Sequence, residues 1–148
     1  MKKTLIATTL ALAVTAASAL EVGLQVGRDF STPNRNYGGL TVGQSVGPVT
    51  LTAGYHRTAT ANDQNRWSLV GGYDLVKVGP VQITPTVGAA YLSNKSMSNG
   101  LAMTVGAEAS MPLTKNLEGV VDYSYQMGQS RVNQFDGNRV SAGVRYKF

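Results

Sequence analysis

Apolar and polar residues alternate with a period of two along most of this chain, in segments of about ten residues. Successive side chains of a β-strand point to opposite faces, so each such segment has one apolar and one polar face. No sustained 3.6-residue periodicity competes with this pattern, and the sequence therefore predicts an all-β fold. The last segment is the clearest, with Val140, Ala142, Val144, Tyr146 and Phe148 on one face and Arg139, Ser141, Gly143, Arg145 and Lys147 on the other.

Eight segments of this kind follow one another along the chain. An even number of amphipathic strands separated by turn residues is typical of a membrane barrel, in which one face meets lipid and the other meets the lumen. A soluble β-sandwich shows similar alternation but would rarely end on a bare Tyr-x-Phe. We therefore predict an eight-stranded antiparallel up-and-down transmembrane β-barrel, with strands at 20–30, 40–46, 49–56, 66–75, 81–92, 101–113, 117–132 and 139–148.

Three residues fit the alternation poorly. Arg28 and Gln44 fall on the lipid-facing side of the first and second segments, and Pro85 lies inside the fifth, where it cannot donate to a ladder. Arg28 lies near the outer rim, from which its side chain can snorkel to headgroups. A β-bulge at any of these places would reset the register of the first, second or fifth strand.

The connections alternate in length. Gly47-Pro48, 76–80 and 112–116 are short, as periplasmic turns are, whereas 31–39, 58–65, 93–100 and 133–138 are longer and polar, as loops outside the cell are. Aromatic rings near the strand ends form two tiers, which is typical of girdles at the membrane interfaces. The outer tier is Phe30, Tyr55, Trp67, Tyr91 and Tyr125, and the inner tier is Tyr73, Tyr146 and Phe148.

Residues 1–19 have the pattern of a secretory signal peptide. Two lysines precede a short apolar core, and Ala17-Ser18-Ala19 offers the small-x-small sequence that signal peptidase accepts. The core is too short to span a membrane as a helix, which needs about 20 residues. A retained anchor is the alternative, but no flanking charges would stop transfer. We expect cleavage between Ala19 and Leu20, which leaves one barrel domain at 20–148.

The composition excludes several classes of function. The chain has no cysteine, so it forms neither disulfides nor a thiolate metal site. The formal net charge of +5 includes the two signal lysines, and the other basic residues are scattered, so nothing favours a nucleic-acid partner. No metal-ligand spacing, phosphate-binding loop or nucleotide motif is present, and we expect no cofactor.

Opposite charges fall on the lumen-facing side of strands that barrel closure makes neighbours. The cations of the last strand would lie between the seventh strand and the first. An unpaired buried charge is costly, and the interior of an eight-stranded barrel is only just wide enough for its side chains. The sequence therefore predicts a plugged lumen, with a conducting pore as the alternative. Its ion-pair network would comprise Glu21, Glu118, Asp122, Arg139, Arg145 and Lys147.

His56 is the only histidine, and an enzymatic function would depend on it. A lipid-modifying barrel enzyme needs a histidine, a hydroxyl nucleophile and an orienting carboxylate within hydrogen-bond reach. Outer-membrane lipid A deacylases carry a His-x-Ser element, whereas this chain reads His56-Arg57-Thr58. We therefore expect His56 to be a hydrogen-bonded residue of the lumen and the protein not to be an enzyme.

The opening Met1-Lys2-Lys3-Thr4, the eight-strand pattern and the terminal Tyr146-Lys147-Phe148 together resemble the OmpA/OmpX-like superfamily of small outer-membrane barrels. The resemblance implies a monomer embedded in outer-membrane lipid, with a role in membrane integrity, adhesion or resistance to host defence. It also implies that the barrel-assembly machinery reads Phe148, with Tyr146 and Val144 as supporting positions. The outer loops are short, which weakens an adhesin assignment. A narrow solute channel and a lipid-modifying enzyme remain the alternatives.

Overall fold

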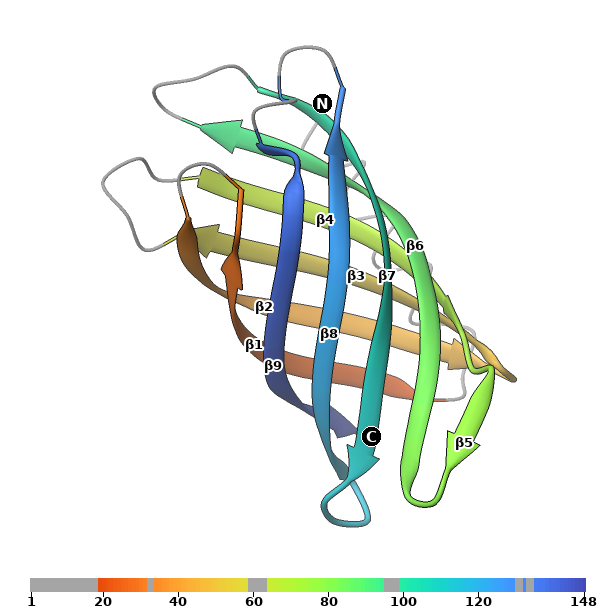
Figure 1. Ribbon diagram of the computed structural model, residues 1–148. Helices are drawn as coiled ribbons and strands as arrows, with labels where there is room; N and C mark the ends of the chain where they lie inside the picture. The colour runs from red at the N-terminus through yellow and green to blue at the C-terminus, as the bar shows by residue number, and fades with distance from the viewer. Residues whose placement is uncertain (1–18, 32–33, 59–63, 95–98, 130–131, 133–134) are drawn as a thin grey trace, which may run out of the picture.

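The described part of the chain folds into a barrel of antiparallel strands and their connections (Figure 1). The computed structural model describes residues 19–31, 34–58, 64–94, 99–129, 132 and 135–148. The sheet order is β4-β3-β2-β1-β9-β8-β7-β6-β5, and an additional pairing of β4 with β6 closes it. The strands are β1 (Leu20–Asp29), β2 (Arg35–Val46), β3 (Val49–Thr58), β4 (Gln64–Tyr73), β5 (Val76–Val78), β6 (Val81–Asn94), β7 (Gly100–Pro112), β8 (Leu117–Gly128) and β9 (Gly137–Lys147).

The wall is made of eight long strands, because β5 is a three-residue extension that pairs only with β6. The predicted eight-stranded antiparallel barrel is confirmed. Its first and last strands pair along nearly their full length, from Glu21 opposite Lys147 to Asp29 opposite Arg139. Among the described residues, no helix is long and apolar enough to cross a membrane.

Short turns and longer connections lie at opposite ends of the barrel, here named the turn end and the loop end (Figure 1). Gly47 and Gly79 each begin a two-residue turn with a positive φ, of 60° and 59°. Glycine adopts this conformation without the steric cost that other residues meet, and tight hairpins require it. The predicted turn at 76–80 is therefore wrong in part, because residues 76–78 are β5 and only Gly79-Pro80 turns.

Strand β2 is longer than the sequence predicts. It begins at Arg35, although residues 31–39 were expected to form a loop. Arg35 and Tyr37 point into the lumen and are 2% and 6% exposed. Strand β8 is shorter than the sequence predicts, because it ends at Gly128 rather than at residue 132.

Pro85 lies at a bulge, as one of the expectations allowed. β4 pairs with β6 as far as Gly72 opposite Thr86, and β5 resumes with Val76 opposite Ile83, so three residues on one side face two on the other. The Ile83 oxygen accepts a hydrogen bond from Leu75 on this side, and the Pro85 nitrogen, two residues further on, points the same way. The missing N–H of Pro85 therefore costs no ladder bond.

No bulge occurs at Arg28 or Gln44, where one was also considered. Residues 20–29 of β1 pair with β2 in unbroken register, and residues 37–46 of β2 do so with β3. Both side chains therefore remain on the outer face. Most of that face is apolar, with exposed Leu24, Val26, Leu40, Leu51, Leu69, Val87, Leu101, Val105 and Val121. A predominantly apolar surface of this extent belongs in a lipid bilayer.

Candidate functional site: the barrel lumen

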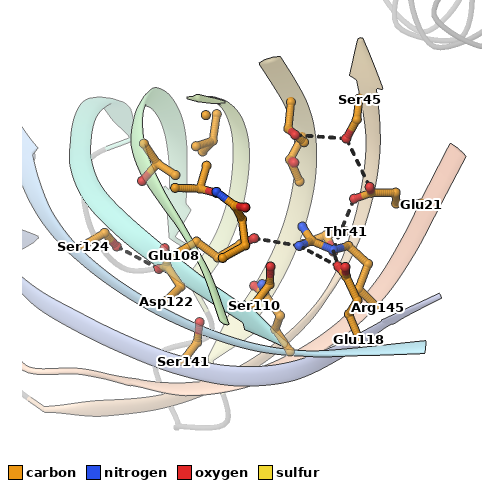
Figure 2. A pocket seen from close by; sticks show the side chains of 18 of the residues that line it. Glu21, Thr41, Ser45, Glu108, Ser110, Glu118, Asp122, Ser124, Ser141 and Arg145 are labelled. Atoms are coloured by element: carbon orange, nitrogen blue, oxygen red, sulfur yellow. Dashed lines mark hydrogen bonds and ion pairs between the residues drawn. The ribbon is translucent and has the colours of Figure 1, made fainter. Parts of the chain in front are cut away.

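A cavity of about 420 Å³ occupies part of the lumen (Figure 2). Its wall is rich in hydroxyl groups, which come from Thr41, Thr52, Ser68, Thr84, Thr86 and Thr104 among others. Exposed Lys77 and Pro80 line it at the turn end, whereas buried Tyr37, His56 and Arg139 line it at the other. The cavity thus opens at the turn end and stops short of the loop end. This differs from the lumen filled throughout that the sequence predicts.

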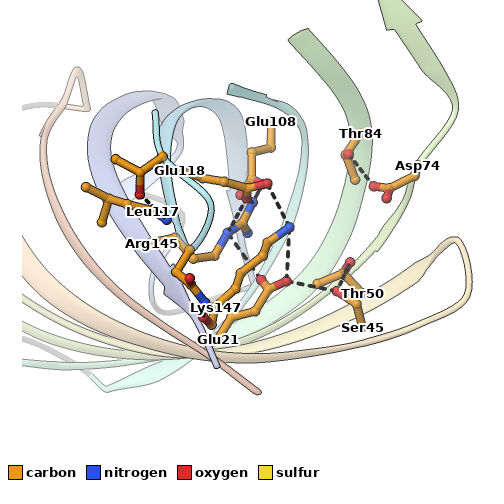
Figure 3. A network of polar contacts seen from close by, with 12 residues as sticks. Glu21, Ser45, Thr50, Asp74, Thr84, Glu108, Leu117, Glu118, Arg145 and Lys147 are labelled. Carbon is orange, nitrogen blue, oxygen red and sulfur yellow. Dashed lines mark hydrogen bonds and ion pairs between the residues drawn. The ribbon is translucent and has the colours of Figure 1, made fainter. Parts of the chain in front are cut away.

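Beside the mouth of the cavity lies a group of charged side chains, here named the turn-end cluster: Glu21, Glu108, Glu118, Arg145 and Lys147 (Figure 3). Arg145 is at its centre. Its Nη2 donates to Glu108 Oε1 at 2.7 Å and to Glu118 Oε2 at 3.2 Å, and its Nε lies 3.2 Å from Glu21 Oε2. Lys147 Nζ lies 2.7 Å from Glu118 Oε1 and 3.6 Å from Glu21 Oε1.

Strand register explains most of this cluster. Arg145 in β9 is opposite Glu118 in β8, and Lys147 is opposite Glu21 in β1. Glu21 is 2% exposed and also accepts a hydrogen bond from Ser45 Oγ at 3.1 Å, which helps to satisfy a deeply buried carboxylate. Three carboxylates face two cations, so the cluster carries a formal charge of −1.

Glu108 is the member of the cluster that the predicted network omitted. It comes from β7, two strands away from β9, and reaches Arg145 across the lumen (Figure 2). The sequence does contain a signal for it, because Glu108 is the sole charged residue of β7 and faces inward. Arguments from neighbouring strands alone could not place it beside Arg145.

Two members of the predicted network, Arg139 and Asp122, do not join the turn-end cluster. Arg139 pairs instead with Asp29, at 3.8 Å, and its guanidinium lies 4.2 Å from the centre of the Tyr37 ring. Asp122 accepts a hydrogen bond from Ser124 Oγ at 3.3 Å and makes no ion pair with a described residue (Figure 2). The single network that the sequence predicts is therefore wrong in these two positions.

The closed end of the cavity is formed by a layer of side chains, here named the loop-end plug: Tyr37, Arg66, Gln126, Phe135 and Arg139. Gln126 links its parts, because its Nε2 donates to the Phe135 carbonyl at 3.0 Å and its Oε1 accepts from Arg66 Nε at 3.2 Å. The Phe135 ring packs in a fully buried apolar group with Leu92, Ala102 and Val132. Strand periodicity placed Arg139 on the lumen-facing side but could not identify Phe135, which lies in a connection where no such periodicity applies.

His56 lies on the cavity side of the plug. Its ring meets Tyr37 edge-on at 5.5 Å and covers Gly39, where an added Cβ would be 2.4 Å from the imidazole. Its Nε2 is 3.2 Å from Gln25 Oε1, and its Nδ1 has no hydrogen-bond partner among the described residues. An amide, rather than a carboxylate, thus orients the ring. The described residues contain no group of three or more His, Asp or Glu side chains that could hold a metal ion.

Several outer-membrane barrels of known structure are similar to this one. Neisserial surface protein A has a TM-score of 0.65 at 16% identity, over 88% of this chain and 96% of that chain. Ail of Yersinia pestis has a TM-score of 0.52 at 14% identity, over 87% and 99%. A transmembrane β-barrel designed de novo has a TM-score of 0.60 at 21% identity, over 88% and 95%.

The chain has the fold of a small eight-stranded outer-membrane barrel. The predicted likeness to such barrels is confirmed for the fold, and the apolar outer face agrees with the predicted location in a bacterial outer membrane. No model of a known protein family matches the sequence, and a comparison with curated proteins gives no match.

The aromatic rings that were predicted to form the two girdles of this outer-membrane barrel all lie on its outer face. Tyr55, Trp67 and Tyr91 are in register across β3, β4 and β6, and the first two rings are 4.5 Å apart. Phe30, Tyr73 and Tyr125 are likewise exposed. Their role as membrane girdles stays a prediction.

The two ends of the barrel domain meet at the turn end. Val144, Tyr146 and Phe148 are exposed on the outer face, and the last two rings contact each other at 4.9 Å. Their recognition during assembly stays a prediction. Leu20 begins β1, and the expected signal peptide lies outside the described residues except for Ala19.

Proposed function

We propose that this protein is a closed, non-conducting barrel of the outer membrane with a structural or surface-interaction role. The observation that carries the proposal is the loop-end plug. Tyr37, Gln126, Phe135 and Arg139 are 6%, 1%, 1% and 4% exposed, so the cavity ends beneath them. A solute that passed would have to separate an ion pair, a cation–π contact and two side-chain hydrogen bonds that are shielded from water.

The proposal includes a monomer surrounded by lipid. The pairing of β1 with β9 leaves none of the long strands with a free edge, which removes the usual route to association between sheets. It also includes the barrel-assembly machinery as a partner during biogenesis, which the exposed Tyr146 and Phe148 rings would meet at the turn end. No enzymatic step is proposed, since His56 faces Gln25 where a catalytic histidine would face a carboxylate.

Planar-bilayer recording tests the closed lumen. The folded wild-type barrel should insert without conductance steps, and reproducible single-channel steps would overturn the proposal. A strain lacking the protein should become more sensitive to detergent, and the wild-type gene should restore resistance. Unchanged detergent sensitivity in that strain would contradict the proposed structural role.

A narrow channel is the second candidate, because the cavity of about 420 Å³ is open at the turn end. A channel would show charge-selective current in the wild type, and widening the plug with Phe135→Ala would increase that current. The closed-barrel proposal expects the wild type to be silent, so the wild-type recording separates the two.

A further inference from the structure

One arginine at the closed end of the lumen cavity has no counter-ion among the described residues. Arg66 is 9% exposed and lines the cavity. Its Nε donates to Gln126, but its Nη1 and Nη2 groups make no hydrogen bond with a described residue, and no described carboxylate is within ion-pair distance of it. Arginine stays protonated in proteins, and a buried cation without an anion is costly. The cavity therefore ends at a group that an anionic ligand would stabilise.

A carboxylate further along the same cavity lacks a cation. Asp122 lines the wall and accepts a hydrogen bond from Ser124 Oγ (Figure 2). It makes no ion pair with a described residue, and Arg139, which the sequence placed in the same network, pairs with Asp29 instead. Two opposite charges thus line one cavity without ion-pair partners in the described part of the chain.

The separation of these two charges sets the length of a ligand that would bridge them. Gln126, to which Arg66 is bonded, and Asp122 point inward from β8 four residues apart, which is roughly 13 Å in an extended strand. A charged contact at each end takes about 3 Å, so the charged groups of the ligand would be roughly 7 Å apart. Two extended amino-acid residues span this distance, at about 3.3–3.6 Å per residue.

Hydroxyl groups line the cavity between the two charges. Ser68 follows Arg66 in β4, two residues nearer to the turn end. Ser124 lies in β8 between Gln126 and Asp122. A hydroxyl both donates and accepts, so these groups match the N–H and the C=O of a peptide group. The cavity volume of about 420 Å³ is within the range of small-molecule sites, and its polar wall suits a polar solute.

We propose that the lumen binds a small zwitterion from the periplasmic side, of the size of a dipeptide with free ends. Its carboxylate binds Arg66 through paired hydrogen bonds, its ammonium binds Asp122, and its peptide group meets the hydroxyls of Ser68 and Ser124. The cavity opens at the turn end, which is periplasmic in barrels of this kind. The turn-end cluster beside the mouth carries a formal charge of −1, which disfavours entry of an anion but not of a molecule without net charge.

Saturation-transfer NMR with the folded barrel in neutral detergent tests the ligand, with empty micelles as the blank. The probes are glycylglycine, N-acetylglycylglycine, glycylglycine methyl ester and glycine. Glycylglycine should bind saturably with a Kd of about 1 mM or below, and the other three at least tenfold more weakly. Equal binding of either blocked form would overturn recognition of both charges, and equal binding of glycine would overturn the length. Absence of saturable binding of glycylglycine up to about 10 mM would overturn the site itself.

Matched variants test the two charged residues. Asp122→Asn keeps an acceptor for Ser124, and it should weaken glycylglycine at least tenfold and remove its advantage over N-acetylglycylglycine. Asp74→Asn is the control, because Asp74 lines the same cavity but is exposed and accepts from Thr84 Oγ1 at 2.7 Å. Arg66→Gln should weaken both probes, whereas Lys77→Gln, at an exposed cation of β5, should leave them unchanged.

Heat-modifiable gel migration shows which variants fold. Arg66 also belongs to the loop-end plug, so if Arg66→Gln does not fold, Asp122→Asn against Asp74→Asn decides alone. Full binding of glycylglycine by Asp122→Asn, or an equal loss in Asp74→Asn, would overturn the proposed site. Binding in micelles is measured separately from bilayer conductance, so a conducting wild type would contradict the closed barrel without altering this result.

Discussion

Replacement of Arg145 by alanine is the most direct test of what stabilises this barrel. Arg145 is the one side chain in contact with all three carboxylates of the turn-end cluster, at 3.2 Å from Glu21, 2.7 Å from Glu108 and 3.2 Å from Glu118. Lys147 would still pair with Glu118 and Glu21 in the variant, because it lies near both. Glu108 would be left without a cation.

The expected loss follows from burial. Removal of one partner from a buried ion pair costs about 3–5 kcal/mol, because a charge is left uncompensated. Side chains of Glu108 and Glu118 are 18% and 15% exposed and lie beside a cavity that opens to water, so hydration lowers this cost. We therefore expect a decrease of about 3 kcal/mol in the free energy of unfolding, at the lower end of that range.

Urea unfolding of the barrel in lipid vesicles measures this loss. Trp67 is the only tryptophan and is 55% exposed on the lipid-facing side, so its fluorescence reports loss of the membrane environment. Lys77→Ala is the matched control and should change stability by less than about 0.5 kcal/mol, since Lys77 is an exposed cation of β5.

A double variant isolates the pairwise interaction. Glu108→Gln should cost less in the Arg145→Ala background than in the wild type, by at least about 1 kcal/mol, because the carboxylate then lacks its cation. An Arg145→Ala variant within about 0.5 kcal/mol of the wild type would refute the electrostatic account of the turn-end cluster. A double-variant cycle that shows no coupling free energy between Arg145 and Glu108 would also refute this account.

Three further substitutions test other parts of the fold by the same urea assay. Gly39→Ala should lower stability by about 2 kcal/mol, since the new methyl group meets Tyr55 O and the His56 ring at 2.4 Å; a neutral result would show that the ring moves freely. Phe135→Ala should lower it by about 3 kcal/mol by emptying the buried apolar group of the plug, and a loss below about 1 kcal/mol would contradict that packing. Gly47→Ala should cost about 1–2 kcal/mol because its φ is 60° although the site is open, and an unchanged midpoint would mean that the turn adapts.

The number of strands could be predicted because strand periodicity depends only on which face each residue meets. The prediction failed at residues 35–39, where Arg35 and Tyr37 alternate with Asn36 and two glycines. That composition is typical of a loop in a soluble protein. In a barrel, the lumen accepts polar and aromatic side chains and the outer face accepts glycine, so the same residues form the start of β2.

The ion-pair network could be predicted only in part, and the reason is geometric. Neighbouring strands place Arg145 beside Glu118 and Lys147 beside Glu21, and register arguments find such pairs. Arg139 lies six residues from Arg145 along β9, which is roughly 20 Å in an extended strand, so one cluster could not contain both. Glu108 was missed because contacts across a lumen depend on barrel closure and strand tilt, which pairwise reasoning on adjacent strands does not include.

The individual properties of this barrel lie in the residues that depart from the apolar–polar alternation. A designed transmembrane barrel shares the fold at 21% identity, so the apolar–polar pattern of the wall is enough to specify the wall and carries no further information about function. Tyr37 and Phe135 place aromatic rings in a polar lumen and close it at one end. Arg28 and Gly38 place a charge and a gap on a face that consists mostly of apolar side chains. Neither pair improves the wall as a membrane-spanning sheet, and departures of this kind are expected at functional sites. Substitutions at Tyr37 and Phe135 should therefore alter the closure of the lumen while the eight-stranded pattern is retained.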